Sequence, residues 1–473
     1  MTSKHYTALI LLLIAVVLLV SIGAKSKRVS PPKEVETTKA EQTIKDTRRQ
    51  ITPTHSRELV REEDRPTEYG DLRFSFSKNE KNVVIITLDR ALSIFFPYIM
   101  EELPEVKDDF KGFTYYPNTL SYGAHTIFGM PACYGGYEYT PEAMNKRDSE
   151  LLKDKHNEAL RLLPTLFSDI GYSVTVCDPP IANYEWVPDL SVFDDMKGVK
   201  VYNTIGVYDP LGDSDFAKFK DNYHVLDSLT KLTDNKSKTG AYISIDNETT
   251  HRYCYLSLPN YTIPENGYVN QWEYNWTKYK SEDEHINIYD SRTQQHYCVN
   301  AATLRVLGEW FRTLRRLGVY SNTKIIIVAD HGYNVVADGV DLTFNGTDTQ
   351  RYNPLLLVKD FNASGDFKTD ETLMTNADVP IFATDGVIEN ATNPYTGNVL
   401  KDMVDKKEVH VYRANNWQVE DNRGYTFKTA NYFRVKDNIF DMNNWSTMKI
   451  NPGSTKTETT TAETIPENER AVR

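Results

Sequence analysis

The chain has 473 residues, and its 54 lysines and arginines against 66 aspartates and glutamates give a net charge of −12. This acidic balance argues against nucleic-acid binding, which favours basic surfaces, so we expect no nucleic-acid partner. The aromatic content of 12% exceeds what a disordered chain carries, which predicts a sizeable core in one large α/β domain or two ordinary ones.

The first feature along the chain is an uncharged apolar run at residues 6–24. Its length is close to the roughly 20 residues that cross a bilayer as a helix, so we predict a transmembrane anchor. A cleaved signal peptide is the alternative, with a small-residue cleavage site at residues 21–23. The basic residues after the run, Lys25, Lys27 and Arg28, would by themselves favour a cytoplasmic location for the C-terminal side of the anchor.

Polar segments flank the part of the chain that we expect to fold. Residues 25–77 are charged, contain several prolines and lack apolar periodicity, which predicts a flexible stalk. Residues 453–473 are rich in Thr and Glu without a hydrophobic face, which predicts a flexible tail. A single folded domain is therefore expected at residues 78–452, and both flanks should be dispensable for its folding.

Two apolar runs, far apart in the chain, each lead into an acidic residue. Residues 82–88 lead into Asp89, and residues 324–329 lead into Asp330 and His331. A continuous apolar run is typical of a strand buried on both faces of a parallel sheet, and ligands bind beyond the carboxyl ends of such strands. We therefore expect both acids at one sheet edge, where they and His331 can bind a metal ion. An ordinary turn after the second strand is the alternative for Asp330 and His331.

Helical and strand patterns alternate along the rest of the domain. Helical patterns occur at residues 92–103, 158–170 and 299–317. Further strand patterns occur at residues 172–177, 241–245 and 354–358. This alternation predicts an α/β fold with a mainly parallel sheet and helices on both faces.

The four cysteines show no spacing typical of a zinc site. They are Cys133, Cys177, Cys254 and Cys298. One or two disulfides in an extracytoplasmic domain and free buried thiols are both open alternatives.

The order of these motifs resembles that of the alkaline phosphatase/sulfatase superfamily. A strand ends at Asp89, a Gly-x-x-Thr turn contains Thr126, a middle strand leads to Thr-Thr-His at His251, and a long helix precedes the strand that ends at Asp330 and His331. The sequence is similar to the lipoteichoic acid synthase, phosphoglycerol transferase and phosphoethanolamine transferase branch. The resemblance covers about residues 82–445 and implies an alkaline phosphatase-like fold.

The resemblance implies a role for each of five residues. Asp89, Asp330 and His331 match the metal ligands of the family. Thr126 matches the nucleophile, which also touches the metal, and His251 matches the histidine that contacts the transferred group. One divalent ion, Mn²⁺, Mg²⁺ or Zn²⁺, suits carboxylate and imidazole ligands and can activate a threonine hydroxyl. Thr126 as a helix cap and His251 as a turn residue are the alternatives.

Some residues depart from patterns found elsewhere in the superfamily. Formylglycine sulfatases need Cys or Ser followed by x-Pro-x-Arg, and neither Thr126 nor Cys133 has that setting. The additional ligands of two-metal phosphatases are also missing after His331, where His410 is the last histidine. We therefore expect a single metal. Arg90 is not a residue that the family pattern predicts, and it could contact an anionic substrate or pair with a nearby acid.

The expected function is that of a membrane-anchored, metal-dependent phosphotransferase or phosphodiesterase. It would move a phospholipid-derived head group, of the phosphoglycerol or phosphoethanolamine type, to a cell-surface acceptor such as a glycopolymer. Members of the family carry the catalytic domain outside the cytoplasm, so we expect an extracytoplasmic domain despite the basic residues after the anchor. A hydrolase of sulfuric or other esters and an inactive surface binding protein are the alternatives, and the joint presence of the proposed metal ligands argues against the second.

Overall fold

The computed structural model describes residues 68–208, 212, 214–265, 269–340, 342–428 and 431–449, together with the backbone of strand Glu458–Thr460. The predicted anchor at residues 6–24 lies outside this part of the chain. Within the described residues, no helix is both long enough and apolar enough to span a bilayer.

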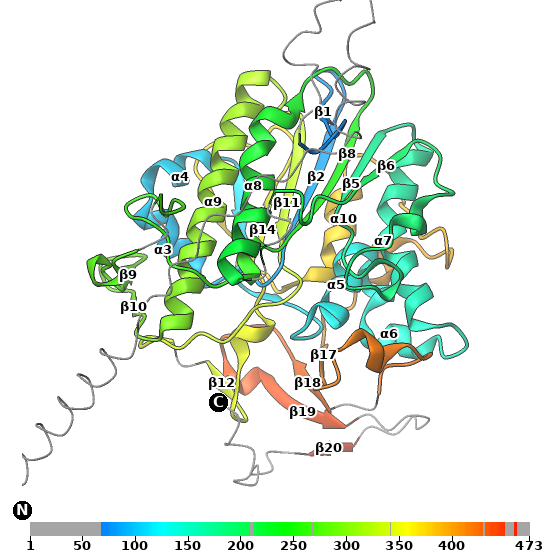
Figure 1. Cartoon of the computed structure of the whole chain (residues 1–473). Helices are drawn as coiled ribbons and strands as arrows, with labels where there is room; N and C mark the ends of the chain where they lie inside the picture. The colour runs from blue at the N-terminus through cyan, green and yellow to red at the C-terminus, as the bar shows by residue number, and fades with distance from the viewer. Residues whose placement is uncertain are drawn as a thin grey trace, which may run out of the picture. The chain divides into compact units, whose positions relative to one another are not determined.

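An eight-stranded sheet forms the centre of the fold, in the order β15-β3-β14-β11-β2-β8-β5-β6. Figure 1 labels the part of this sheet from β14 to β6. Its strands are β2 (Asn82–Leu88), β3 (Phe113–Tyr115), β5 (Ser173–Cys177), β6 (Val199–Tyr202), β8 (Ala241–Asn247), β11 (Thr323–Val328), β14 (Leu356–Lys359) and β15 (Lys368–Thr369). The five strands from β11 to β6 are parallel, whereas β14 runs antiparallel to both of its neighbours. The mainly parallel sheet predicted from the sequence is confirmed.

Helices cover both faces of this sheet because its central strands are apolar at nearly every position. Along β2, Val84 and Ile86 face one hydrophobic core, and Val83 and Ile85 face another, as the alternation of side chains along a strand requires. The first core is covered by α3 (Phe95–Glu102), α4 (Pro104–Asp109), α8 (Asp215–Leu232) and α9 (Ser291–Leu317). The second is covered by α5 (Thr126–Gly135), α7 (Leu152–Asp169) and α10 (Val379–Thr384). Figure 1 shows α8 and α9 side by side over one face.

Shorter elements connect these layers. They are helix α6 (Pro141–Lys146) and the strands β1 (Phe74–Ser75), β4 (Thr119–Leu120), β7 (Thr233–Asp234), β9 (Thr277–Tyr279), β10 (His285–Asn287), β12 (Thr343–Phe344), β13 (Thr347–Asp348) and β16 (Met374–Thr375).

The four cysteines are all buried and free, so the free-thiol alternative describes this structure.

A second, antiparallel sheet comes after the central one in the chain. It contains β17 (Val409–Arg413), β18 (Asn431–Val435), β19 (Trp445–Lys449) and β20 (Glu458–Thr460). The ring of Tyr412 lies 4.7 Å from that of Phe128 on α5, which packs this sheet against the start of that helix. Strand β20 falls inside the predicted flexible tail at residues 453–473, and its backbone pairs with that of β19.

The fold also begins earlier than the predicted domain boundary at residue 78. Leu72, Phe74 and Phe76 are completely buried, and β1 pairs in parallel with β7. The sequence alone places residues 68–77 in the stalk, because three alternating apolar residues make too short a pattern to stand out among charged neighbours. Because Leu72, Phe74 and Phe76 bury their large apolar side chains, these three residues belong to the core.

The first prediction concerns this N-terminal segment. Phe74→Ala should lower the free energy of unfolding by about 3–5 kcal/mol, because truncating a buried phenylalanine loses transfer free energy and leaves a cavity. Urea unfolding followed by circular dichroism measures this change. Val187→Ala, at a side chain that is 74% exposed, is the control and should change stability by no more than about 0.5 kcal/mol. A cost below about 1 kcal/mol for Phe74→Ala would show that the segment is peripheral to the fold.

Candidate active site

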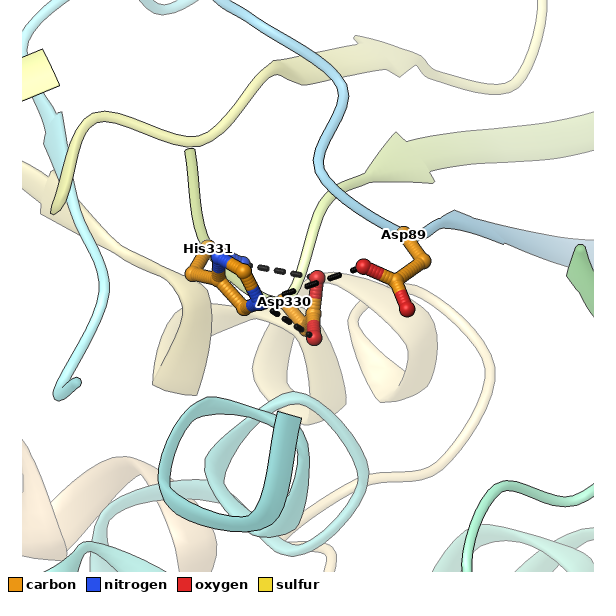
Figure 2. A group of neighbouring side chains, drawn as sticks. All are labelled: Asp89, Asp330 and His331. Carbon is orange, nitrogen blue, oxygen red and sulfur yellow. Dashed lines mark hydrogen bonds and ion pairs between the residues drawn. The ribbon is translucent and has the colours of Figure 1, made fainter. Parts of the chain in front are cut away.

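Strands β2 and β11 place two acidic residues side by side at one edge of the sheet. The strands are adjacent and parallel, with Thr87 opposite Val328, so Asp89 and Asp330 both emerge at the carboxyl edge. Asp330 and His331 are almost completely buried, and Asp89 is 5% exposed. One ligand atom from each of these three residues lies within 4.8 Å of the others (Figure 2). The predicted juxtaposition of the two carboxylates is thus present in the structure.

The orientation of the His331 ring suits a metal ligand. Its Nδ1 donates a hydrogen bond to the carbonyl oxygen of Gly332 at 2.7 Å, which leaves the lone pair on Nε2. Nε2 lies 3.5 Å from Asp330 Oδ2 and 3.9 Å from Asp89 Oδ1 (Figure 2). Burial lowers the pKa of His331 well below its usual value, which favours the neutral form that metal binding requires.

Each carboxylate turns one oxygen toward this ring without satisfying it by a hydrogen bond. Asp330 Oδ1 accepts from the backbone N–H of Arg90 at 3.2 Å and of His331 at 2.8 Å. Asp330 Oδ2 and Asp89 Oδ1 are buried and have no hydrogen-bond partner among the described residues. Buried oxygens left in this way are costly unless a ligand satisfies them. Two such oxygens and one imidazole nitrogen form a donor set that fits a divalent cation.

The pKa values of the two acids diverge. Burial, followed by the negative charge of Asp89, raises the pKa of Asp330 well above its usual range. Burial also acts to raise the pKa of Asp89, but the neighbouring histidines and Arg90 together lower it. Repulsion between two buried carboxylates is the physical reason that this arrangement favours a bound cation.

Thr126 is the first residue of α5, and its hydroxyl reaches the same site. Thr126 Oγ1 lies 3.5 Å from Asp89 Oδ2. The capping position is occupied by His125, and no side-chain cap bond is present, so Thr126 is not the helix cap considered above.

Two residues bring the start of α5 against the metal ligands. A Cβ at Gly129 would collide with the carbonyl oxygen of Asp330, so only glycine allows the helix to approach this closely. Asn376 Nδ2 then donates to the carbonyl oxygens of Gly129 and Asp330, at 3.1 and 2.9 Å. The sequence alone does not reveal this role of Asn376, since a side chain that bridges two backbones leaves no local pattern.

His251 approaches the site from the loop after β8. It ends the 3₁₀ turn Thr249–His251, which is fastened to β2 by a 2.6 Å hydrogen bond from Thr250 Oγ1 to the carbonyl oxygen of Asp89. Burial lowers the pKa of His251, although the charge of Asp89 opposes this effect. Its Nδ1 is buried without a partner among the described residues. All five residues singled out in the sequence therefore gather at one sheet edge.

The second prediction concerns metal content. The purified protein should contain about one divalent ion per chain, measured by inductively coupled plasma mass spectrometry, because one site is formed by these three ligands. His331→Gln should weaken metal affinity by more than the roughly 10–100-fold that the loss of an outer-shell partner costs. His410→Gln is the matched control, because His410 also pairs with a carboxylate, at 2.7 Å from Glu142, but lies outside the three-residue cluster. Unchanged metal content in His331→Gln would refute this ligand set.

No family model and no curated protein matches the sequence. The structure is similar to that of an alkaline phosphatase superfamily protein from Vibrio parahaemolyticus, with 12% identity, 84% of this chain and 87% of that one covered, and a TM-score of 0.41. It is also similar to the lipoteichoic acid synthase LtaP from Listeria monocytogenes, with 12% identity, 81% of this chain and 88% of that one covered, and a TM-score of 0.42. A phosphonate monoester hydrolase from Silicibacter pomeroyi is similar as well, with 12% identity, 78% of this chain and 88% of that one covered, and a TM-score of 0.42.

Proposed function

We propose that this protein is a metal-dependent phosphotransferase or phosphodiesterase in which Thr126 is the nucleophile. The observation that carries this proposal is the position of the Thr126 hydroxyl, 3.5 Å from Asp89 Oδ2, beside two buried carboxylate oxygens without partners among the described residues. A hydroxyl at a cation site is suited to attack a phosphorus centre, because coordination is one way to activate a weak alcohol nucleophile.

The residues of the site suggest how the reaction would proceed. A divalent cation held by Asp89, Asp330 and His331 would supply charge stabilisation for the phosphoryl oxygens and lower the pKa of the nucleophile. Thr126 Oγ1 would form a bond to phosphorus while the bond to the leaving alcohol breaks. The threonine proton passes to solvent, and the leaving oxygen takes up a proton. An acceptor hydroxyl or water would then attack the phosphorus of the threonine phosphodiester, which still carries the head group. The bond from phosphorus to Thr126 Oγ1 would break, the attacking oxygen would lose its proton to solvent, and Oγ1 would take up a proton.

Two further features favour a phosphoryl group at this position. Thr126 opens a ten-residue helix, and the first backbone N–H groups of a helix, with its dipole, stabilise anions. His251 has a buried ring nitrogen without a partner among the described residues, so it can hold a phosphoryl oxygen by a hydrogen bond. His251 is therefore proposed to position the transferred group.

The proposed donor is a phospholipid-derived head group, and the proposed acceptor is a cell-surface molecule such as a glycopolymer. Hydrolysis of sulfuric or other esters is less well supported, because Thr126 and Cys133 lack the x-Pro-x-Arg setting of formylglycine sulfatases. A binding protein without activity has no need for a threonine hydroxyl beside these metal ligands.

The third prediction tests the nucleophile. Thr126→Ala should reduce hydrolysis of bis(p-nitrophenyl) phosphate on the order of 10³-fold or more while the bound metal stays, because Asp89, Asp330 and His331 are intact. Thr126→Ser should keep part of the activity, since the hydroxyl survives. His251→Gln should lower turnover about 10²–10³-fold, as the loss of a transition-state hydrogen-bond donor does.

Intact-mass spectrometry of rapidly quenched reactions should show a p-nitrophenylphosphoryl adduct on the parent protein and none on Thr126→Ala. Turnover by Thr126→Ala at the parent rate would exclude Thr126 as the nucleophile and favour attack by a metal-bound water.

The fourth prediction concerns location, for which we propose an extracytoplasmic domain tethered by residues 6–24. Protease added to intact cells should cleave between the anchor and the folded domain, and the domain should appear in the medium on an immunoblot. Complete protection in intact cells, lost only after lysis, would place the domain in the cytoplasm, as the basic residues after the anchor by themselves indicate.

A further inference from the structure

Two arginines and two tyrosines form a cluster next to the candidate active site. Arg90 directly follows Asp89, Tyr253 follows His251 by two residues, and Tyr333 follows His331 by two residues. Arg292 lies in the first turn of α9. We call Arg90, Tyr253, Arg292 and Tyr333 the arginine–tyrosine cluster. Three of its members are thus attached to the loops that carry the proposed catalytic and metal-binding residues.

The four side chains contact one another crosswise. The Arg90 guanidinium lies 4.9 Å from the centre of the Tyr333 ring, and its Nη1 is 3.5 Å from the Tyr253 hydroxyl. The Arg292 guanidinium lies 4.8 Å from the centre of the Tyr253 ring, and its Nη1 donates to the Tyr333 hydroxyl at 3.3 Å. Each arginine therefore contacts both tyrosines, and the two positive charges are held near each other.

Neither arginine has a carboxylate partner in the part of the chain that the structure describes. The neighbouring Arg252 forms an ion pair with Glu248, but within the described residues no ion pair is formed by Arg90 or Arg292. Arg90 Nε is also buried without a hydrogen-bond acceptor among the described residues. A buried donor without a partner destabilises the protein, and an anionic ligand would offset this cost.

The backbone at Arg90 adds to this cost. Its φ angle is 63°, in the left-handed region that is strained for a residue with a Cβ. This conformation lets the backbone N–H of Arg90 donate to Asp330 Oδ1, a bond that glycine could form without strain. An arginine at a position that favours glycine motivates a search for a role of its side chain.

The rings of the cluster are supported by a histidine. His296 on α9 is buried, and its Nε2 donates to the carbonyl oxygen of Thr250 at 2.8 Å. Its ring lies 5.5 Å from that of Tyr253 and 6.0 Å from that of Tyr333. Packing against this ring fixes the two tyrosines, and through them the arginines, before any ligand binds.

We propose that the arginine–tyrosine cluster binds a second anionic group of the substrate, next to the phosphoryl group at the metal site. This inference rests on the proposed function and narrows its substrate class. The preferred substrate carries a negative charge beside the transferred group, as the neighbouring phosphodiester of a polyanionic polymer does. A zwitterionic head group such as phosphoethanolamine would place its ammonium group against two unpaired arginines and is disfavoured by charge repulsion.

A series of three chromogenic substrates tests this selectivity. The p-nitrophenyl esters of phosphoethanolamine, phosphoglycerol and phosphoglycerate place a positive, neutral or negative group beside the same phosphodiester. The value of kcat/KM should rise in that order for the parent protein. Arg90→Gly and Arg292→Gln should each reduce kcat/KM for the phosphoglycerate ester about tenfold more than for the phosphoglycerol ester, a difference of about 1.4 kcal/mol. The control is Arg161→Gln on α7, where Arg161 pairs with Asp195, and it should leave the order unchanged.

A binding measurement separates this inference from the proposed chemistry. In the Thr126→Ala protein, isothermal titration calorimetry should show free phosphoglycerate binding about tenfold more tightly than glycerol phosphate, and Arg90→Gly or Arg292→Gln should remove this preference. If the parent protein turned over none of the three esters while this preference remained, the proposed function would fail and the anion site would stand. Equal affinities, or a preference that survives both substitutions, would overturn the inference.

Thermal unfolding distinguishes a binding role from a structural one. Arg90→Gly should keep or raise the melting temperature, because glycine relieves the left-handed backbone while the N–H donor to Asp330 is retained. A fall in melting temperature with unchanged substrate order would show that Arg90 serves packing only.

Discussion

The repulsion between two buried carboxylates is the constraint on which the site depends. Adjacent parallel strands deliver Asp89 and Asp330 to the same edge, and each keeps one buried oxygen without a partner among the described residues. Such a pair is tolerated only where positive charge or a cation compensates it. Groups from the surrounding elements stabilise the two carboxylates or complete the site. His331 turns a lone pair toward the acids, backbone N–H groups hold the other oxygen of Asp330, and α5 brings Thr126 to the same point. The geometry that creates the repulsion is therefore also the geometry that can bind a divalent ion.

The elements that could be predicted from the sequence are those with a clear apolar pattern over consecutive residues. Strands β2 and β11 are uninterrupted apolar runs because both faces of each are buried, and the acid that follows each run marks the strand end. Helix α8 escaped prediction because its buried face includes Asp221, Asn222 and Ser228, which interrupt the apolar periodicity. The antiparallel sheet of β17 to β20 also escaped, because its strands are short and depend on pairing with one another. Such pairing is a tertiary effect that local propensity does not reveal.

The residues of the candidate site also differ in whether they could be predicted from the sequence. Asp89, Thr126, His251, Asp330 and His331 could be named beforehand because each follows a recognisable strand or lies in a motif of a known family. The arginine–tyrosine cluster could not, although Arg90 stands out in the sequence as unusual. Arg90 and Tyr253 are 163 positions apart, and Arg292 reaches the cluster from a helix whose sequence shows only amphipathic periodicity. Contacts between polar side chains of distant segments leave no periodic signal, and so they become visible only once the fold is known.

Arg90 and Arg292 carry positive charge at this site, whereas the protein as a whole is negatively charged. A net charge of −12 would by itself disfavour an anionic substrate. Exposed charges more than about 8 Å away are largely screened at physiological ionic strength, however, so the groups beside the substrate determine the local potential. Arg90 and Arg292 lack carboxylate partners among the described residues, and Arg90 is partly buried, where screening is weaker. A cation held by Asp89 and Asp330 would offset their charge, leaving two arginines as the excess at this edge. An acidic protein can in this way attract a polyanion at one place, beside the reacting group.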